Sequence, residues 1–149
     1  MKFKSFHDRS LIMGTILAAQ SLQGWMKTNL KNTSGLSFLG SLILISLYFE
    51  ENKKGISPSR LAQTLGYSKS RVSQEISFLN NEGYVRRNLS NSSARSIFVC
   101  LTSAGERKSS DLIKGFSRLQ SLIDRVVGER QAESINKHLL LLRDHLEIA

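Results

Sequence analysis

Residues 57–101 hold the pattern that most restricts the fold, because it contains two short helices, a tight turn and two strands in succession. Ser57 followed by Pro58 is typical of a helix start, where serine caps the backbone and proline takes the first helical position. Gly66 suits the end of this short helix, where a positive φ is often needed. Ser68 then precedes a second helix. A short helix, a turn and a second helix predict a helix-turn-helix.

The second helix is expected from about Lys69 to Asn81, with its apolar stripe formed by Val72, Ile76 and Leu79. Two strand patterns follow, at 84–89 and 96–101, and the polar segment 90–94 between them predicts a hairpin. A hairpin behind a helix-turn-helix forms a wing. The predicted fold class is therefore mainly α, with a winged helix-turn-helix and a small β-hairpin.

Helical patterns also flank this module. We expect helices at about 10–30, 36–51 and 131–147, and a break at 31–35. A long helix is expected after the hairpin, with Thr102 or Ser103 as its N-cap. If Ser103 is the cap, Glu106 is placed as its capping-box partner. The predicted organisation is an N-terminal dimerisation helix in 1–35, a DNA-binding region in 36–101 and C-terminal dimerisation helices in 102–149. The three parts form one intertwined domain.

The net charge of +9 is concentrated in the middle of the chain. Residues 53–108 hold ten basic and three acidic residues, whereas the other 93 residues hold eleven and nine. A basic centre between nearly neutral flanks indicates an acidic partner such as nucleic acid. The most apolar window, 36–49, is too short to span a membrane, so we expect a soluble, cytoplasmic protein with no membrane partner.

The outward face of the second helix is short and polar, as contact with DNA base edges requires. Gln74 can pair with adenine, and serines can contact bases or phosphates. The candidate DNA-binding residues of this helix are Lys69, Ser70, Arg71, Ser73, Gln74 and Ser77.

The wing and the helix starts supply further candidates. An arginine at a hairpin tip can enter the adjacent minor groove, and Arg95 is placed for this role. Arg86 and Arg87 alternate across a strand, so at most one easily faces DNA. The wing candidates are Arg86, Arg87, Ser92, Ser93 and Arg95, and the candidate phosphate contacts are Ser57, Arg60 and Ser68.

The chain resembles the MarR family of bacterial transcription regulators. The resemblance lies in residues 57–66, 68–76 and 79–87, and in Leu101-Thr102-Ser103-Ala104-Gly105, which matches the family's Leu-Thr-x-x-Gly join between wing and long helix. It implies a homodimer that binds a pseudo-palindromic site in double-stranded DNA, and often a small aromatic or anionic effector. One departure is in the wing: the family's Asp-x-Arg is Ser93-Ala94-Arg95 here, so the arginine loses a charge-assisted partner.

Other side chains point to simpler roles. Cys100 is expected to be a buried, inert thiol, and a single cysteine excludes an intrachain disulfide. His138 and His145 share a helix face, but their spacing matches no recognised ligand pattern, so no metal or other cofactor is expected. Trp25, Met26, Tyr48 and Phe49 could line an effector pocket or pack in the core. No enzyme motif is present.

The sequence therefore predicts a sequence-specific, dimeric transcription regulator, expected to repress and to respond to an effector. Three alternatives stay open: a non-specific or anti-silencing DNA-binding protein, a winged-helix protein-interaction module that has lost DNA binding, and a peripheral membrane protein. The last would need a basic amphipathic helix, whereas the charge lies on the helix-turn-helix and wing.

Overall fold

The computed structural model describes residues 10–50, 55–90 and 93–146, without the side chains of 30–34, 89–90 and 93–96. Its contacts divide the chain into two compact units, Met1–Leu112 and Ile113–Ala149. The elements are α2 (Leu11–Ser34), α3 (Phe38–Tyr48), α4 (Pro58–Leu65), α5 (Lys69–Asn81), β1 (Val85–Ser90), β2 (Ser93–Leu101), α6 (Ser103–Val127) and α7 (Glu129–Leu146). Helix α6 begins in the first unit and continues into the second.

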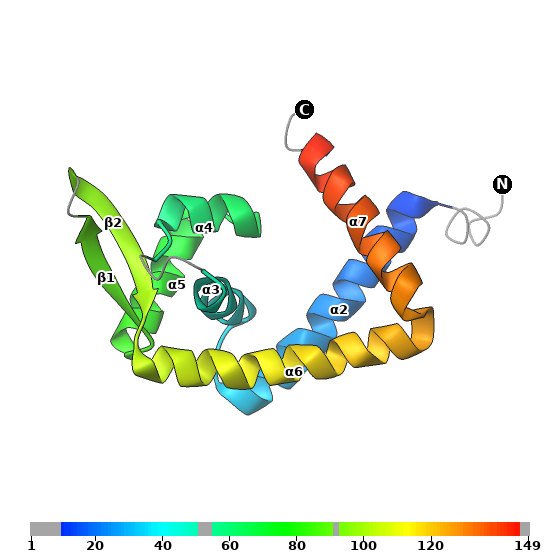
Figure 1. Cartoon of the computed structure of the whole chain (residues 1–149), viewed down its shortest axis with the longest axis horizontal. Helices are drawn as coiled ribbons and strands as arrows, with labels where there is room; N and C mark the ends of the chain where they lie inside the picture. Colours follow the sequence, from blue (N-terminus) through cyan, green and yellow to red (C-terminus); the bar gives the residue numbers. More distant parts are fainter. Residues whose placement is uncertain (1–9, 51–54, 91–92, 147–149) are drawn as a thin grey trace. The chain divides into compact units, whose positions relative to one another are not determined.

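The core of the first unit lies around α3. Figure 1 shows this helix end-on, with α4 above it and the hairpin beside it. Ile43 and Leu44 of α3 are completely buried, as are Val72, Ile76 and Leu79 of α5. The apolar stripe predicted for the second helix is therefore the face that packs in the core, and the predicted winged helix-turn-helix is confirmed.

The local signals at the helix-turn-helix are confirmed. The Oγ of Ser57 accepts a hydrogen bond from the backbone N–H of Arg60 at 3.3 Å, and Ser68 does the same for Arg71 at 3.3 Å. Gly66 ends α4 with a φ of 68°, a conformation that costs little only for glycine. These caps begin and end the two helices where the sequence predicted.

The hairpin is antiparallel and its register pairs Val85 with Leu101 and Arg87 with Val99. Ile56 adds a bridge to Val99, with the two backbone N–H···O hydrogen bonds at 3.0 and 2.9 Å. The strands extend to Ser90 and from Ser93, so the turn is shorter than the predicted loop 90–94. The pairing passes from Leu89 and Ile97 directly to Ser90 and Ser93, so the register is irregular at this end of the hairpin.

Four predicted helix boundaries are wrong. Residues 31–34 are helical, and the break comes at Gly35, whose φ is 69°, because polar residues lower helix propensity much less than this glycine does. Helix α3 begins one residue after Ser37, which caps it, and ends at Tyr48 rather than 51. The last helix begins at Glu129, directly after Gly128.

The predicted capping box at the start of the long helix is also wrong. The Oγ1 of Thr102 accepts a hydrogen bond from the N–H of Gly105 at 3.1 Å, so Thr102 is the cap and Ser103 is the first helical residue. With Thr102 as the cap, Glu106 is the fourth helical residue, whereas the partner in a capping box is the third.

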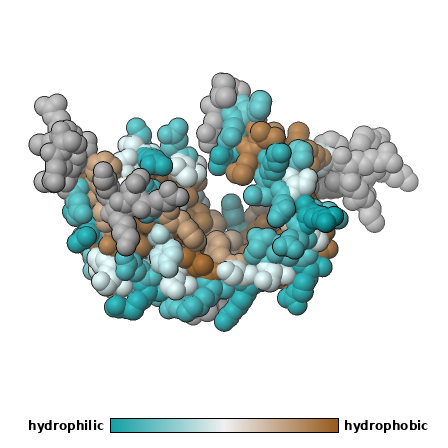
Figure 2. Space-filling model, viewed as in Figure 1, coloured by the Kyte–Doolittle hydropathy of each residue, from teal (hydrophilic) through white to brown (hydrophobic). Residues whose placement is uncertain are grey.

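Both terminal helices carry exposed apolar side chains. On α2, in the first unit, Leu11 and Ile12 are 77% and 72% exposed. On α7, in the second unit, none of the residues is buried, and Figure 2 shows brown, apolar atoms on its surface. The exposed apolar residues of α7 are Ile135, Leu139, Leu140, Leu141, Leu142 and Leu146. Among the described helices, none is long and apolar enough to cross a membrane.

Candidate nucleic-acid interface

Helix α5 presents a continuous polar face to solvent. Its buried stripe of Val72, Ile76 and Leu79 fixes the rotation of the helix, so the opposite side points outward. All of the predicted contact residues on this helix are exposed: Lys69, Ser70, Arg71, Ser73, Gln74 and Ser77. The packing of α5 thus places small polar side chains where a groove of DNA could approach them.

One basic side chain of α5 is held by an aromatic ring. The guanidinium carbon of Arg71 lies 5.2 Å from the centroid of the Tyr67 ring, within the range of a cation–π interaction. Tyr67 lies in the turn between α4 and α5. The turn therefore restricts the directions in which Arg71 can reach.

The sides of α5 are tied to two other elements by side-chain hydrogen bonds. Ser37, the cap of α3, donates its hydroxyl proton to Oε1 of Glu75 at 2.7 Å. From the hairpin, Nη2 of Arg87 donates to Oγ of Ser77 at 2.8 Å. Sequence reasoning placed Arg87 and Ser77 among the DNA contacts and missed Ser37 and Glu75 altogether, because no sequence spacing shows contacts 38 residues apart.

The wing arginines on β1 lie in different surroundings. Arg87 reaches α5, whereas Arg86, on the other side of the strand, lines a pocket with Cys100 and Arg107. Arg95 and Ser93 belong to β2, but their side chains lie outside the described part of the structure. Ser92 lies outside the described residues.

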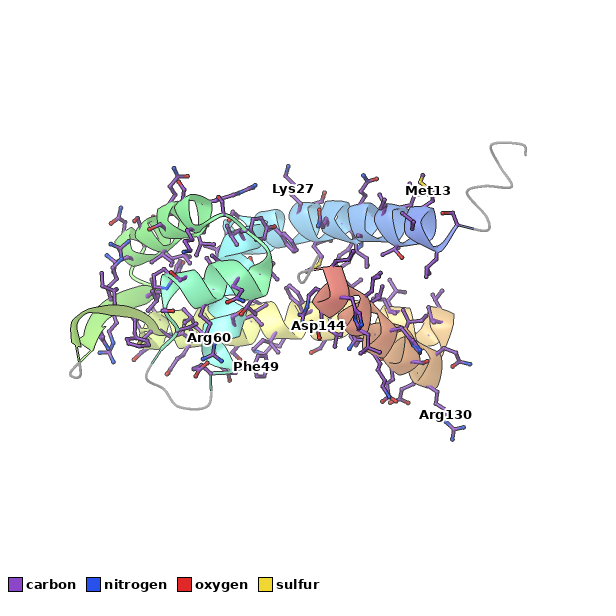
Figure 3. The ribbon with its side chains drawn as sticks, turned by 90° about the horizontal axis from the view of Figure 1, so that it is seen from above. Met13, Lys27, Phe49, Arg60, Arg130 and Asp144 are labelled. Carbon is purple, nitrogen blue, oxygen red and sulfur yellow. The ribbon has the colours of Figure 1, made fainter. Side chains whose placement is uncertain are left out.

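The predicted phosphate contacts divide into two kinds. Ser57 and Ser68 use their side-chain oxygens as helix caps, so each keeps its hydroxyl proton for a further acceptor. Arg60 is exposed on α4, where Figure 3 labels it. All three lie on the helix-turn-helix itself.

Thr102 joins the hairpin to α6 and to the end of α5. Its Oγ1 lies 2.6 Å from the carbonyl oxygen of Gly83 and 3.2 Å from that of Tyr84, and its N–H donates to the same Tyr84 oxygen at 3.0 Å. A Cβ on Gly105 would collide with that oxygen, so only glycine fits. This geometry explains why Leu-Thr-x-x-Gly occurs at this join.

The four residues predicted to line an effector pocket do not come together. Figure 3 shows Phe49 at the end of α3 that lies away from α2, which carries Trp25 and Met26. Met26 is buried and Phe49 is 65% exposed. Tyr48 lines a pocket of about 630 Å³ that is also lined by Arg86 and Cys100 of the hairpin.

A second pocket, of about 450 Å³, lies between α2, the start of α3 and the turn before α5. Its lining includes Lys27, which Figure 3 shows pointing outward from α2, together with Tyr67 and Arg71. The sequence did not indicate that Lys27 and Arg71 line a common pocket, because the lining residues come from four separate segments of the chain.

The cysteine and the histidines take part in local contacts. Cys100 is 6% exposed, and the side-chain amide of Asn88 donates to its Sγ at 3.5 Å. The Nδ1 atoms of His138 and His145 lie 2.6 and 2.8 Å from backbone oxygens of their own helix. Within the described residues, no group of three potential metal ligands comes together.

Comparison with solved structures identifies this arrangement of helices and wing. A MarR/EmrR family transcriptional regulator from Acinetobacter sp. ADP1 superimposes with a TM-score of 0.82 at 18% sequence identity, over 96% of this chain and 99% of that one. The chain has the MarR-type winged-helix fold.

Two further structures share the MarR-type fold. The MepR–DNA complex of S. aureus gives a TM-score of 0.78 at 14% identity, over 91% of this chain and 98% of that one. AbsC, a MarR family regulator from Streptomyces coelicolor, gives 0.77 at 23% identity, over 91% of each chain. No protein-family model and no curated protein sequence matches the chain. In the MarR-type fold of this chain, α5 is the second helix of the helix-turn-helix, and the hairpin is the wing.

Proposed function

We propose that this protein is a MarR-family transcription regulator that binds double-stranded DNA through α5, called the recognition helix below, and through the wing. The observation that carries the proposal is the exposed face of Ser70, Ser73 and Gln74 on a helix whose other side is buried in a MarR-type fold. The fold also occurs in MepR of S. aureus, which has been solved in complex with DNA.

The charge distribution supports a nucleic-acid partner. The excess of basic residues in 53–108 belongs to the helix-turn-helix, the wing and the start of α6. Such a field attracts the phosphate backbone regardless of sequence, whereas base contacts provide the choice of site. We therefore assign specificity to Ser70, Ser73 and Gln74, and to Arg95 in the minor groove.

The proposed assembly is a homodimer on a pseudo-palindromic operator, which it represses. The exposed apolar residues of α2 and those of α7 support dimerisation, since contiguous apolar surface in water is usually covered by a partner. In such a dimer, two recognition helices would enter major grooves one DNA turn, or a multiple of it, apart.

A small aromatic or anionic effector is part of the proposal. The pocket with Lys27, Arg71 and Tyr67 supports it, because its two cations outnumber its one carboxylate, Glu75, which is already bonded to Ser37, and the Tyr67 ring can stack on an aromatic carboxylate. Benzoate at millimolar concentration should raise the melting temperature, and Lys27→Gln should reduce that shift. An unchanged melting temperature of the unaltered protein would argue against this ligand class.

The experiment that tests DNA recognition is selection of bound duplexes from a random pool. The proposal predicts an enriched sequence with two inverted half-sites. Enrichment of no sequence, with retention of all duplexes at low salt, would support non-specific binding instead. Failure to retain any duplex at low salt would support a protein-interaction module.

A further inference from the structure

Arg87 lies on the face of β1 whose neighbouring side chains pack in the core. Val85, two residues earlier on the same face, is 2% exposed, and Val99, opposite Arg87 on β2, is completely buried. Arg87 therefore leaves the strand on the side of the recognition helix, where its guanidinium bonds to Ser77. Arg86 leaves on the other side and lines the pocket next to Cys100.

The hydroxyl of Ser77 is occupied by two partners. It donates its only proton to the carbonyl oxygen of Ser73 at 3.0 Å and accepts the hydrogen bond from Arg87 at 2.8 Å. One lone pair remains, so Ser77 could donate to a DNA base only by breaking its bond to Ser73. Ser70 and Gln74, on the same face, make no such side-chain bond within the described part of the chain.

The hydrogen bond between Arg87 and Ser77 thus joins the two elements that are proposed to contact DNA. Binding a major groove with one element and the adjacent minor groove with the other requires a fixed spacing between them. Because this hydrogen bond already holds the wing to the recognition helix in the free protein, the two elements lose less conformational entropy when they bind DNA.

We propose that Arg87 and Ser77 form a latch, meaning this side-chain hydrogen bond, which positions the wing relative to the recognition helix and thereby increases discrimination between DNA sequences. Arg87 is then a positioning residue that acts through Ser77, and neither residue reads a base. The inference rests on the proposed function and goes beyond it, because it removes two residues from the set of DNA contacts and gives them a different role.

The alternative role for Arg87 is a direct phosphate contact, and salt dependence separates the two. Each phosphate contact changes the slope of log K against log salt by about 0.9 on duplex DNA, whereas a positioning residue leaves the slope unchanged. Ser77→Ala removes the latch without changing charge. Arg118→Gln is the matched control, because it removes the same charge from an exposed position on α6 that is not among the residues proposed to contact DNA.

The test measures dissociation constants for the selected duplex and a scrambled duplex, between about 50 and 200 mM salt, for Ser77→Ala, Arg87→Gln, the double variant and Arg118→Gln. We expect each single latch variant to reduce the affinity ratio of the two duplexes about tenfold. The double variant should lose no more than either single one. The salt slope of Arg87→Gln should match that of Arg118→Gln, and Arg118→Gln should keep the wild-type ratio.

Three results would overturn the latch: additive losses in the double variant, a salt slope for Arg87→Gln that is shallower by about 0.9 than that of Arg118→Gln, or unchanged discrimination in Ser77→Ala. A wild-type protein that fails to distinguish the two duplexes would overturn the proposed function as well. That outcome is distinct, because it is seen before any variant is measured.

Discussion

Gly105 shows how a single residue connects the wing to the long helix. A side chain at this position would collide with the carbonyl oxygen of Tyr84, which already accepts the N–H of Thr102. The end of the recognition helix, the base of the hairpin and the start of α6 therefore meet within a few atoms. Position 105 tolerates only glycine for reasons of space, although the residue is helical.

Gly105→Ala should lower the free energy of unfolding by about 2 kcal/mol, in the range of overpacking at a tight site. Denaturant unfolding measures this change. Gly115→Ala in the same helix is the control: nothing lies within 4 Å of its added Cβ, so the stability should stay the same or rise by up to about 1 kcal/mol. Equal effects of the two substitutions would contradict the assigned contact.

Arg95→Ala should weaken binding to the selected duplex by about 1–3 kcal/mol, because a groove-inserted arginine would be lost. Fluorescence anisotropy with the selected duplex measures this loss. An affinity equal to that of the unaltered protein would remove Arg95 from the interface.

Residue-scale features differ in how far the sequence predicts them. Ser57, Gly66 and Ser68 were predicted correctly because a cap depends on residues within one helical turn. The pairing of Arg87 with Ser77 depends on how the hairpin packs against α5, so the sequence suggested only that both are polar and near DNA. The same holds for the pocket cations Lys27 and Arg71, which come from different helices.

At the scale of elements, the recognition helix is docked onto the start of α3. Helix α3 has no acidic residue in its own first turn, and Glu75 of α5 supplies a carboxylate there, bonded to the Ser37 cap. An added Cβ at Gly40 would lie 2.5 Å from Oε1 of Glu75, so the two helices approach closely. A carboxylate near a helix N-terminus is stabilising because of the helix dipole.

Glu75→Gln should therefore lower the free energy of unfolding by about 0.5–1 kcal/mol. Thermal unfolding at low salt gives the largest signal, since salt screens the charge. The control is Glu82→Gln at the C-cap of the same helix, where an acidic residue is unfavourable to the dipole. Equal losses in the two variants would indicate a general effect of charge and not this contact.

The elements themselves were largely predictable, as were the ends of α4 and α5, whereas the ends of α2 and α3 and the start of α7 were not. Periodic apolar residues predicted the helices of the winged module, and β-branched residues predicted β2, because both patterns reflect burial on one face. Residues 31–34 were expected to break the first helix, but a polar segment can continue a helix until a residue such as Gly35 stops it.

At the scale of the whole molecule, the fold leaves large apolar surfaces on its terminal helices. The apolar residues of α7 are each at least 40% exposed, as are Leu11, Ile12 and Trp25 of α2. A single copy in water would leave these surfaces uncovered, and the proposed homodimer covers them. The division of the chain into 1–35, 36–101 and 102–149 stays a prediction that depends on this dimer.

Deleting residues 131–149 should abolish the dimer, because most of α7 is removed with its exposed leucines. Sedimentation velocity of the full chain and the truncated chain measures the assembly directly. The truncated chain is expected to aggregate or to lose the dimer peak. A truncated chain that still sediments as a dimer would show that α7 is not the dimerisation surface.

If this protein with the MarR-type fold prefers one DNA sequence, the ratio of two dissociation constants shows that preference. Dissociation constants are measured at 0.15 M salt for the selected duplex and for a scrambled duplex of the same composition. We expect the selected duplex to bind at least about 10³-fold more tightly, as is typical of specific DNA-binding proteins. A ratio near one would leave only the attraction between a basic protein and phosphate, and would contradict sequence-specific recognition.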